Sequence, residues 1–591
     1  MSHTLEYVII AVYLVFMLVM GAAFHSMNRN VSDYFRSGCQ GTWWLVGTSI
    51  FMSGISAITF TSNAGVAYAA GLSYLIIYAG TVVGLVMNWL FLAGWFRQLR
   101  AITFPEVVRQ RYGPATQQIY AYVGLVMFLL GASMQLWALA LFSGAMFGLN
   151  IITVILLLGL VVTVYATTGG SWAMMATEFV QGLILVPVTV LVAILCLLKV
   201  GGVGGLLELV SQQGLGANFA LFKGENTFPG GNYAAMWIIA MLVFQVKTQC
   251  SLSSAARYFT VKDGREASKA ALLAAVLMGV CMIFWVIPPL CARLLYAADV
   301  AALPLANPGE GSYAVISMRL LPYGMTGLIA VAMFSATMSS MDAGINRNAA
   351  MVVRDVIPAL RRLTGKAPMS DTRQLVVGKF TSLAFGLTIV ALACYFATAS
   401  GKGIFDVAFR IGAMLGGPMS VPLILGLFVR RAPWWSGLVA AGAGFVPSLI
   451  ELGGTVIFHR ESWSWPTLTL VIMGVSAVAY AATIPFWKYS RPEYRRQIDV
   501  FFERMHRPVD FEKEVGKGND AMQLRMIGFF ATAIGGFMSL LALLPNPLTD
   551  RLLILAIAGF VCLVGIFMLV QARKKFHAMR EPHKVGELVT K

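Results

Sequence analysis

The sequence predicts an all-α membrane protein with about fifteen transmembrane helices, built around a core of two inverted five-helix repeats. Hydrophobic residues make up 58% of the 591 positions and charged residues only 12%, as expected of a chain that lies mostly in a bilayer. Apolar stretches of about 20 residues, the length that crosses a membrane, recur along the whole chain. Two of these stretches are interrupted by polar residues, and each begins a set of five predicted spans.

The predicted spans divide the chain into seven parts. In order, these are a helix outside the core (1–42), the first five-helix repeat (43–200), an extracellular loop (201–231), the second, inverted repeat (232–431), two accessory helices (432–487), a basic cytoplasmic loop (488–525) and two last helices with a short tail (526–591). Because five is an odd number, the second repeat enters the membrane upside down relative to the first. We expect the first helix to be retained, since it lacks the basic start and the cleavage site of a signal peptide.

Basic residues cluster after alternate predicted spans. The clusters lie at 97–111, 257–269, 354–373, 430–431, 488–525 and 573–575. The positive-inside rule places these loops in the cytoplasm, with the N-terminus outside and the C-terminus inside. A loop at Thr167–Ser171 is predicted on the same side, although it carries no basic residue. The net charge of +17 therefore reflects topology in a plasma membrane, such as the bacterial inner membrane, and not nucleic-acid binding.

The basic loop contains an apolar stripe with helical spacing, formed by Ile498, Phe501, Phe502 and Met505. Arginines flank the stripe, so the segment is predicted to be an amphipathic helix. Two placements satisfy its apolar face equally well: against the inner leaflet of the membrane, or against the helix bundle.

The two interrupted spans carry the functional prediction. The segment 52–63 contains serines, threonines and a glycine, and the segment 244–251 contains Gln245 and Lys247. Such groups cost free energy in hydrocarbon unless they line a cavity or bind a ligand. Broken helices at corresponding positions of two repeats indicate the binding site of a secondary transporter. We therefore predict an ion-coupled solute symporter.

Four motifs resemble those of the sodium:solute symporter family, which includes the sodium/glucose cotransporters and shares the inverted-repeat fold of the leucine transporter. They are Thr103–Gly113, Thr168–Gln181, Ala336–Ser340 and Pro422–Arg431. The resemblance implies a secondary active transporter that couples inward sodium flow to uptake of a small organic solute by alternating access. Sodium is then a transported ion and not a prosthetic group, the bilayer is the other partner, and no enzymatic activity is expected.

A sodium site is predicted where the first interrupted span meets the eighth core helix. Ser339 and Ser340 offer adjacent hydroxyls, and the Ala336 carbonyl lies one helical turn before them. The resemblance adds the carbonyls of Met52 and Ile55. Hydroxyl and carbonyl oxygens are the ligands that hard cations prefer. The alternative is that the two serines only allow close helix packing, as small residues commonly do in membranes.

A second ion site is an open question. In some family members a second sodium uses further hydroxyls beyond the serine pair and an aspartate on core helix five, but here these positions carry Asp342, Ala343 and Glu178. Glu178 and Asp342 could bind a cation or share a proton, since two adjacent carboxylates resist joint ionisation. A salt bridge with an arginine such as Arg257 is the alternative.

Eight residues are predicted to contact the solute, and the resemblance places four of them, Ser56, Thr59, Ser251 and Phe409, at the family's pocket. The full set is Ser56, Thr59, Tyr78, Gln245, Lys247, Ser251, Phe409 and Arg410. Lys247 and Arg410 are cations inside predicted spans, which are expensive to bury and suit an anionic solute such as an acidic sugar or carboxylate. Arg410 also lies four residues after Asp406, so the two could pair, and Lys247 could extend to water. A neutral sugar or polyol, or an amino acid, remains the alternative substrate.

Other classes of function are disfavoured. The six histidines lie near termini or loops, so no clustered catalytic set suggests an enzyme, and no nucleotide-binding motif suggests a pump. Two alternatives stay open: a proton-coupled symporter of the same fold, and a transporter-like membrane sensor, although little sequence follows the last span.

Overall fold

The computed structural model describes residues 4–25, 36–399, 403–516 and 518–589. These residues form helices, with no strand among them beyond an isolated bridge between Gly41 and Val261. Within the described part, 12 helices are long and apolar enough to cross a membrane, or up to 14 if each of two bent pairs is one span. The all-helical membrane fold is therefore confirmed, whereas the count of fifteen is not.

Both interrupted stretches form bent helix pairs. The first consists of α3 (Trp43–Ser53), α4 (Ala57–Phe60) and α5 (Ser62–Ala70), and the second of α13 (Ala235–Cys250) and η4 (Leu252–Thr260). The bends are 56° and 42°. Extended backbone at Ser56 and Ser251 separates the segments of each pair. The predicted breaks are thus confirmed.

The other long helices surround these two pairs. In chain order they are α1 (Thr4–His25), α6 (Ser73–Met87) with α7 (Ala93–Gln98), α9 (Pro114–Phe147), α10 (Ile151–Val200), α14 (Gly264–Leu295), α17 (Met325–Met351) with α18 (Ile357–Leu363), α19 (Asp371–Ala399), α20 (Ile404–Ile411) with α21 (Gly417–Phe428), α22 (Ser436–Val456), α23 (Trp465–Thr483), α26 (Asp520–Leu540) and α27 (Leu548–Val589). The loop predicted at Thr167–Ser171 is wrong, because α10 stays helical through it; the side chains of 165–170 lie outside the described residues.

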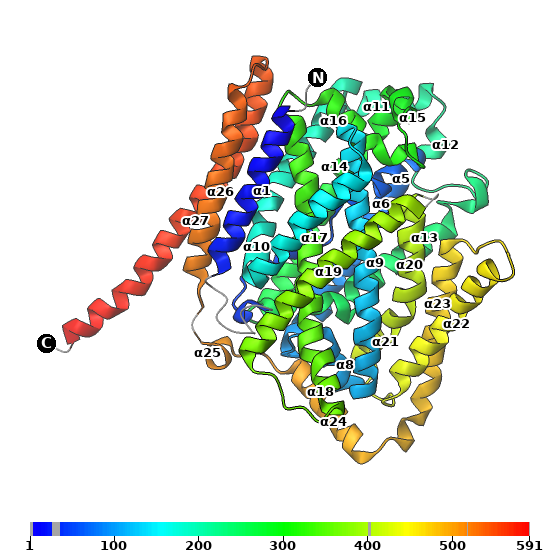
Figure 1. Cartoon of the computed structure of the whole chain (residues 1–591), viewed down its shortest axis with the longest axis vertical. Coiled ribbons are helices and arrows are strands. Elements are labelled where there is room, and N and C mark those ends of the chain that lie inside the picture. The colour runs from blue at the N-terminus through cyan, green and yellow to red at the C-terminus, as the bar shows by residue number, and fades with distance from the viewer. Residues whose placement is uncertain (1–3, 26–35, 400–402, 517, 590–591) are drawn as a thin grey trace.

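The last two helices lie beside α1 at one edge of the bundle, opposite α22 and α23 (Figure 1). The Phe530 ring of α26 lies 5.8 Å from that of Phe16 and 6.2 Å from that of Phe24 in α1. Helices α26 and α27 approach closely, since a Cβ placed on Gly528 would lie 2.9 Å from the Gly565 carbonyl oxygen. Small residues permit such close helix packing in membranes.

The amphipathic helix α24 (Pro492–His506) lies at the same end of the bundle as α8 (Phe104–Tyr112) (Figure 1). Its apolar stripe is fully covered: Ile498 and Met505 are 0% exposed, Phe501 3% and Phe502 8%. Helix α24 contacts α7 and α8, which shield this stripe from solvent. The stripe therefore packs on the bundle, and the alternative placement on the inner leaflet is wrong.

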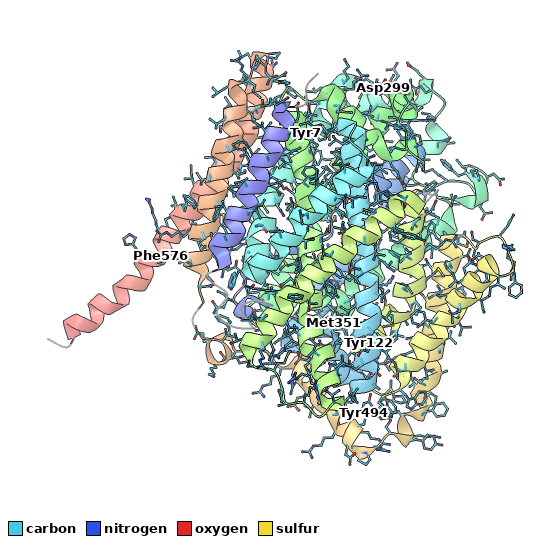
Figure 2. The ribbon with its side chains drawn as sticks, in the orientation of Figure 1. Tyr7, Tyr122, Asp299, Met351, Tyr494 and Phe576 are labelled. Atoms are coloured by element: carbon cyan, nitrogen blue, oxygen red, sulfur yellow. The ribbon has the colours of Figure 1, made fainter. Side chains whose placement is uncertain are left out.

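Basic clusters that are far apart in the sequence meet around α24 and the segment after it. Arg100 pairs with Glu514, Arg430 with Asp499, and Lys262 with Asp520. In Figure 2, Tyr494 marks this end and Asp299 the opposite one. The loops that carry these clusters therefore lie at one end of the bundle, and their side of the membrane stays a prediction.

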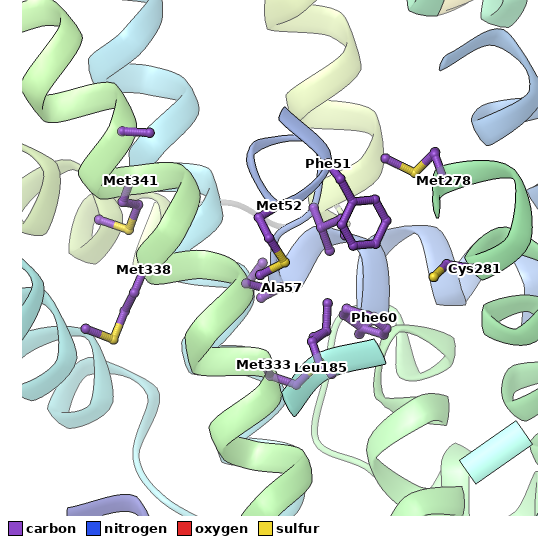
Figure 3. Packing of buried hydrophobic residues seen from close by; sticks show 14 of the residues in the cluster. Phe51, Met52, Ala57, Phe60, Leu185, Met278, Cys281, Met333, Met338 and Met341 are labelled. Carbon is purple, nitrogen blue, oxygen red and sulfur yellow. The ribbon is translucent and has the colours of Figure 1, made fainter. Parts of the chain in front are cut away.

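The first bent pair packs against α17, α14 and α10. Figure 3 shows Met52 and Ala57 beside α17, with Phe60 close to Leu185. These side chains belong to one cluster of buried apolar residues. The packing fixes the break of the first pair against its neighbours.

Candidate functional site

The break of the first bent pair is tied directly to α17. The Ala57 N–H donates a hydrogen bond to Thr337 Oγ1 at 2.9 Å, and the Ile55 N–H donates to the Met52 carbonyl at 3.1 Å. The structure therefore brings the helix that carries Ala336, Ser339 and Ser340 against the segment that carries Met52 and Ile55.

The two serines of α17 have different partners. Ser339 donates to Glu178 Oε1 at 3.1 Å, whereas Ser340 donates to Gln135 Oε1 of α9 at 2.7 Å. A hydroxyl that donates its proton keeps its lone pairs. Both oxygens thus retain the capacity to bind a cation, although their protons point toward different neighbours.

Glu178 of α10 forms a buried ion pair with Arg257 of η4. Arg257 Nη2 lies 2.7 Å from Glu178 Oε1, and Ser49 donates to the other carboxylate oxygen. Arg257 also donates to Ser53 Oγ at 2.8 Å. Of the alternatives for Glu178, the structure contains the salt bridge. Asp342 is buried on α17, three residues after Ser339.

A cavity of about 360 Å³ lies next to these groups, toward the end of the bundle that bears α8. Its polar lining consists of two guanidinium groups, four amides and eight hydroxyls. These belong to Arg257, Arg347, Asn88, Gln135, Gln249, Asn348, Ser53, Tyr120, Thr248, Ser253, Ser254, Tyr258, Ser340 and Ser420. No aspartate or glutamate lines it among the described residues. The cavity therefore presents positive charge and many hydrogen-bonding groups.

The sequence profile of the sodium:solute symporter family matches residues 34–441. The chain belongs to the sodium:solute symporter family. It is 24% identical over 482 residues to the sodium/sialic acid symporter NanT of Aliivibrio fischeri, covering 80% of this chain and 92% of that protein. It is 26% identical over 487 residues to sodium/glucose cotransporter 4 of Danio rerio, covering 75% and 71%.

A solved structure shares the fold of this symporter. The substrate-bound, outward-open structure of a sodium-coupled sialic acid symporter superposes with a TM-score of 0.69 at 21% identity, covering 82% of this chain and 98% of that one. The predicted family and transporter fold are confirmed. The protein is thus a multi-pass membrane transporter that carries sodium together with a solute.

Three of the predicted solute contacts of the symporter have local structural roles. Ser56 caps α4 by accepting from the Ile58 N–H, and Thr59 accepts from the Ser56 N–H. Tyr78 accepts from Asn63 Nδ2 at 3.0 Å and is buried. None of the three lines the cavity.

The predicted cations of the symporter also lie outside the cavity lining. Lys247 is buried with its Nζ 4.3 Å from the centre of the Phe244 ring, and it donates to the Gly412 carbonyl at 3.4 Å. Arg410 pairs with Glu451 of α22 at 2.8 Å. The suggested Arg410–Asp406 pair is therefore wrong.

The last three predicted contacts pack against other helices. Phe409 stacks on Phe405 with 4.3 Å between ring centres. Gln245 packs on α6, where a Cβ at Gly80 would lie 2.8 Å from its Cβ. Ser251 is buried at the break of the second pair. None of them lines the cavity, so their contact with solute stays a prediction.

Sequence reasoning missed two groups of this site, Gln135 and Arg347. Gln135 is a polar residue inside a predicted span and accepts the Ser340 hydroxyl. Arg347 is a cation inside α17, only four residues before its end. A charged residue within a span is itself a signal of function, so the sequence contained the signal for Arg347.

Proposed function

We propose that this symporter couples inward sodium flow to uptake of an anionic, hydroxyl-rich solute such as an acidic sugar. The observation that carries the proposal is the composition of the cavity: two guanidinium groups, no carboxylate among the described lining residues, and many amides and hydroxyls. Arginine suits carboxylates because of its planar, multiple donors. The names of two relatives, both sodium/sialic acid symporters, support the same class of solute.

The sodium ion in this proposal lies between the first break and α17. The carbonyls of Met52, Ile55 and Ala336 and the hydroxyls of Ser339 and Ser340 would supply its oxygens. The hydrogen bond from the Ala57 N–H to Thr337 supports this placement, because it ties the two backbone segments together. In such folds, the carbonyls that a helix break frees coordinate ions.

The proposed topology places the α8 end of the bundle in the cytoplasm and the N-terminus outside. The basic clusters at this end support it through the positive-inside rule. The cavity then lies on the cytoplasmic side of the first break, as expected of a form that releases sodium and solute inward.

Uptake into proteoliposomes tests the proposal. We expect accumulation of radiolabelled sialic acid or glucuronate with an inward sodium gradient and none with potassium. The double variant Ser339→Ala/Ser340→Ala should raise the sodium concentration for half-maximal uptake more than tenfold. The matched control is Ser335→Ala, one turn away on α17, whose hydroxyl donates to Tyr13 of α1.

The alternatives give different results in the same assay. Uptake driven equally well by a proton gradient without sodium would contradict the sodium site and favour Glu178 and Asp342 as proton carriers. Uptake of glucose or a polyol, with no uptake of either acid, would contradict the anionic solute. A double variant with unchanged sodium dependence would contradict the assignment of Ser339 and Ser340.

A further inference from the structure

Arg347 is one of the two arginines that line the cavity. It lies on α17 and lines the cavity together with its neighbours Gly344 and Asn348. Among the described residues, it takes part in none of the ion pairs of the molecule. A half-buried guanidinium without a carboxylate is costly in a membrane protein unless it faces water or a ligand.

The second arginine of the cavity is already neutralised. Arg257 is paired with Glu178 at 2.7 Å, and Ser53 and Met174 occupy further positions around its guanidinium. Arg257, Arg347 and Glu178 together carry one net positive charge. Because Arg257 is paired with Glu178, that charge remains on Arg347.

The two cations predicted to contact the solute are not among the residues that line the cavity. Lys247 is held by the Gly412 carbonyl and the Phe244 ring, and Arg410 is paired with Glu451. An anionic solute that enters the cavity therefore meets Arg347 as its uncompensated cation among the described lining residues.

The surroundings of Arg347 suit an acid that also carries hydroxyl groups. Asn348 lies beside it, and Gln135 and Ser340 lie further along the same wall. Ser340 precedes Arg347 by seven residues, which is about 10 Å along a helix. A carboxylate at Arg347 would therefore lie well away from a sodium ion at Ser340, with the rest of the solute between them.

We propose that Arg347 is the carboxylate receptor of this cavity, and that it holds an anionic solute on the inner side of the first break before release. This inference rests on the proposed function, because it deepens the choice of an anionic solute to one residue. Arg347 fixes the acid group, and the amides and hydroxyls around the cavity bind the rest of the molecule. The separation from Ser340 makes acid recognition independent of sodium affinity.

Three variants test the role of Arg347 in purified, full-length protein. Arg347→Gln removes the charge, Arg347→Lys keeps it, and Arg319→Gln removes an arginine charge that pairs with Asp299 away from the cavity. Binding of sialic acid and of its neutral methyl ester is measured in sodium by calorimetry. Uptake of both compounds and its sodium dependence are measured in proteoliposomes. Melting temperatures identify any variant that fails to fold.

We expect Arg347→Gln to weaken sialic acid binding at least tenfold and to leave binding of the methyl ester within twofold of wild type. Arg347→Lys should recover part of the lost affinity for sialic acid, and Arg319→Gln should keep the wild-type affinity. The sodium dependence of uptake should be the same in all variants as in wild type. Equal losses for acid and ester, or no loss for either, would overturn the role of Arg347. Failure of wild-type protein to bind or transport any acid would instead overturn the proposed function, and the inference with it. If Arg347→Gln does not fold, Arg347→Lys provides the test. Weakening of sialic acid binding and of methyl ester binding by the same factor in that variant would overturn the proposal.

Discussion

Arg257 of the second bent pair and Glu178 of α10 form an ion pair with 2.7 Å between Nη2 and Oε1 and with side chains only 7% and 0% exposed. Ser49 of α3 and Ser339 of α17 donate to the same carboxylate. Helices from both predicted repeats thus meet at one buried charge. The arrangement satisfies Glu178 fully, because a carboxylate accepts several hydrogen bonds and is stabilised by an adjacent cation.

Breaking this pair from one side should destabilise the protein strongly. Glu178→Gln leaves the Arg257 guanidinium buried without a counter-charge, and such changes typically cost about 3–5 kcal/mol. The double variant Glu178→Gln/Arg257→Met should recover much of the loss, since it removes both charges. Unfolding in detergent measures both effects.

The exposed pair of Arg100 and Glu514 provides the matched control for this experiment. Its side chains are 25% and 35% exposed, so Glu514→Gln should cost less than about 1 kcal/mol. A double variant at the buried pair that is no more stable than Glu178→Gln alone would contradict the argument from uncompensated charge.

The salt bridge of Glu178 and the single sodium site proposed at Ser339 and Ser340 together predict electroneutral transport of a monovalent acid. One sodium ion carried with one monovalent anion moves no net charge. A membrane potential of about 100 mV, worth about 2.3 kcal/mol per charge, should therefore change accumulation less than twofold. Uptake into proteoliposomes with a potassium-diffusion potential measures this. An increase of about fifty-fold would instead show one uncompensated positive charge and hence a second coupled cation.

The sequence predicted the parts of the fold that depend on composition along one helix. Serine, threonine and glycine cluster between Met52 and Asn63, where they predict a break of the span, and the helix bends there. The helical spacing of the apolar residues in α24 likewise predicted an amphipathic helix. However, an apolar stripe does not distinguish lipid from protein as its cover, so the packing of Phe501 on the bundle needed the structure.

Partners across helices were harder to predict than positions along them. Arg410 lies four residues after Asp406, yet its partner is Glu451, because the side chain faces α22. Spacing within one helix does not report which neighbouring helix a face meets. The same limit applies to Ser339 and Ser340, which are adjacent in sequence but donate to different helices.

Arg111, the arginine of the Thr103–Gly113 motif, joins the end of α21 to α24. It is 1% exposed, and it donates to the carbonyls of Gly426 and Val429 at the end of α21 and to the Tyr494 hydroxyl of α24. The planar guanidinium satisfies three acceptors that an ammonium group cannot reach together. Arg111→Lys should therefore lower the free energy of unfolding by about 1–3 kcal/mol.

A second variant separates the contribution of α24 from that of α21. Tyr494→Phe removes one of the three acceptors and the hydroxyl that donates to the Arg111 carbonyl at 2.9 Å, but it leaves both carbonyl contacts of the guanidinium, so its cost should stay near about 1 kcal/mol. Thermal unfolding of both variants measures the difference. Equal effects of the two substitutions would contradict the role of Arg111 as a cap for the carbonyls of α21.

Glu310 predicts a specific pH dependence of stability. It lies in η5 (Pro308–Gly311), outside the membrane spans, and its Oε1 accepts the Ile404 N–H at the start of α20 at 3.0 Å. Burial raises the pKa of Glu310 from 4.5 to about 7. The folded protein thus holds this proton more tightly than the unfolded chain.

The sign of the effect follows from proton linkage. Between about pH 4.5 and pH 7 the folded state binds more protons at Glu310 than the unfolded state does, so the free energy of unfolding falls as the pH rises through this window and levels off above it. The full change is about 3 kcal/mol. Glu310→Gln should remove this slope while the buried amide keeps the hydrogen bond from Ile404. Melting temperatures of wild type and variant from pH 5 to pH 8 measure the difference, and parallel curves would contradict the assignment to Glu310.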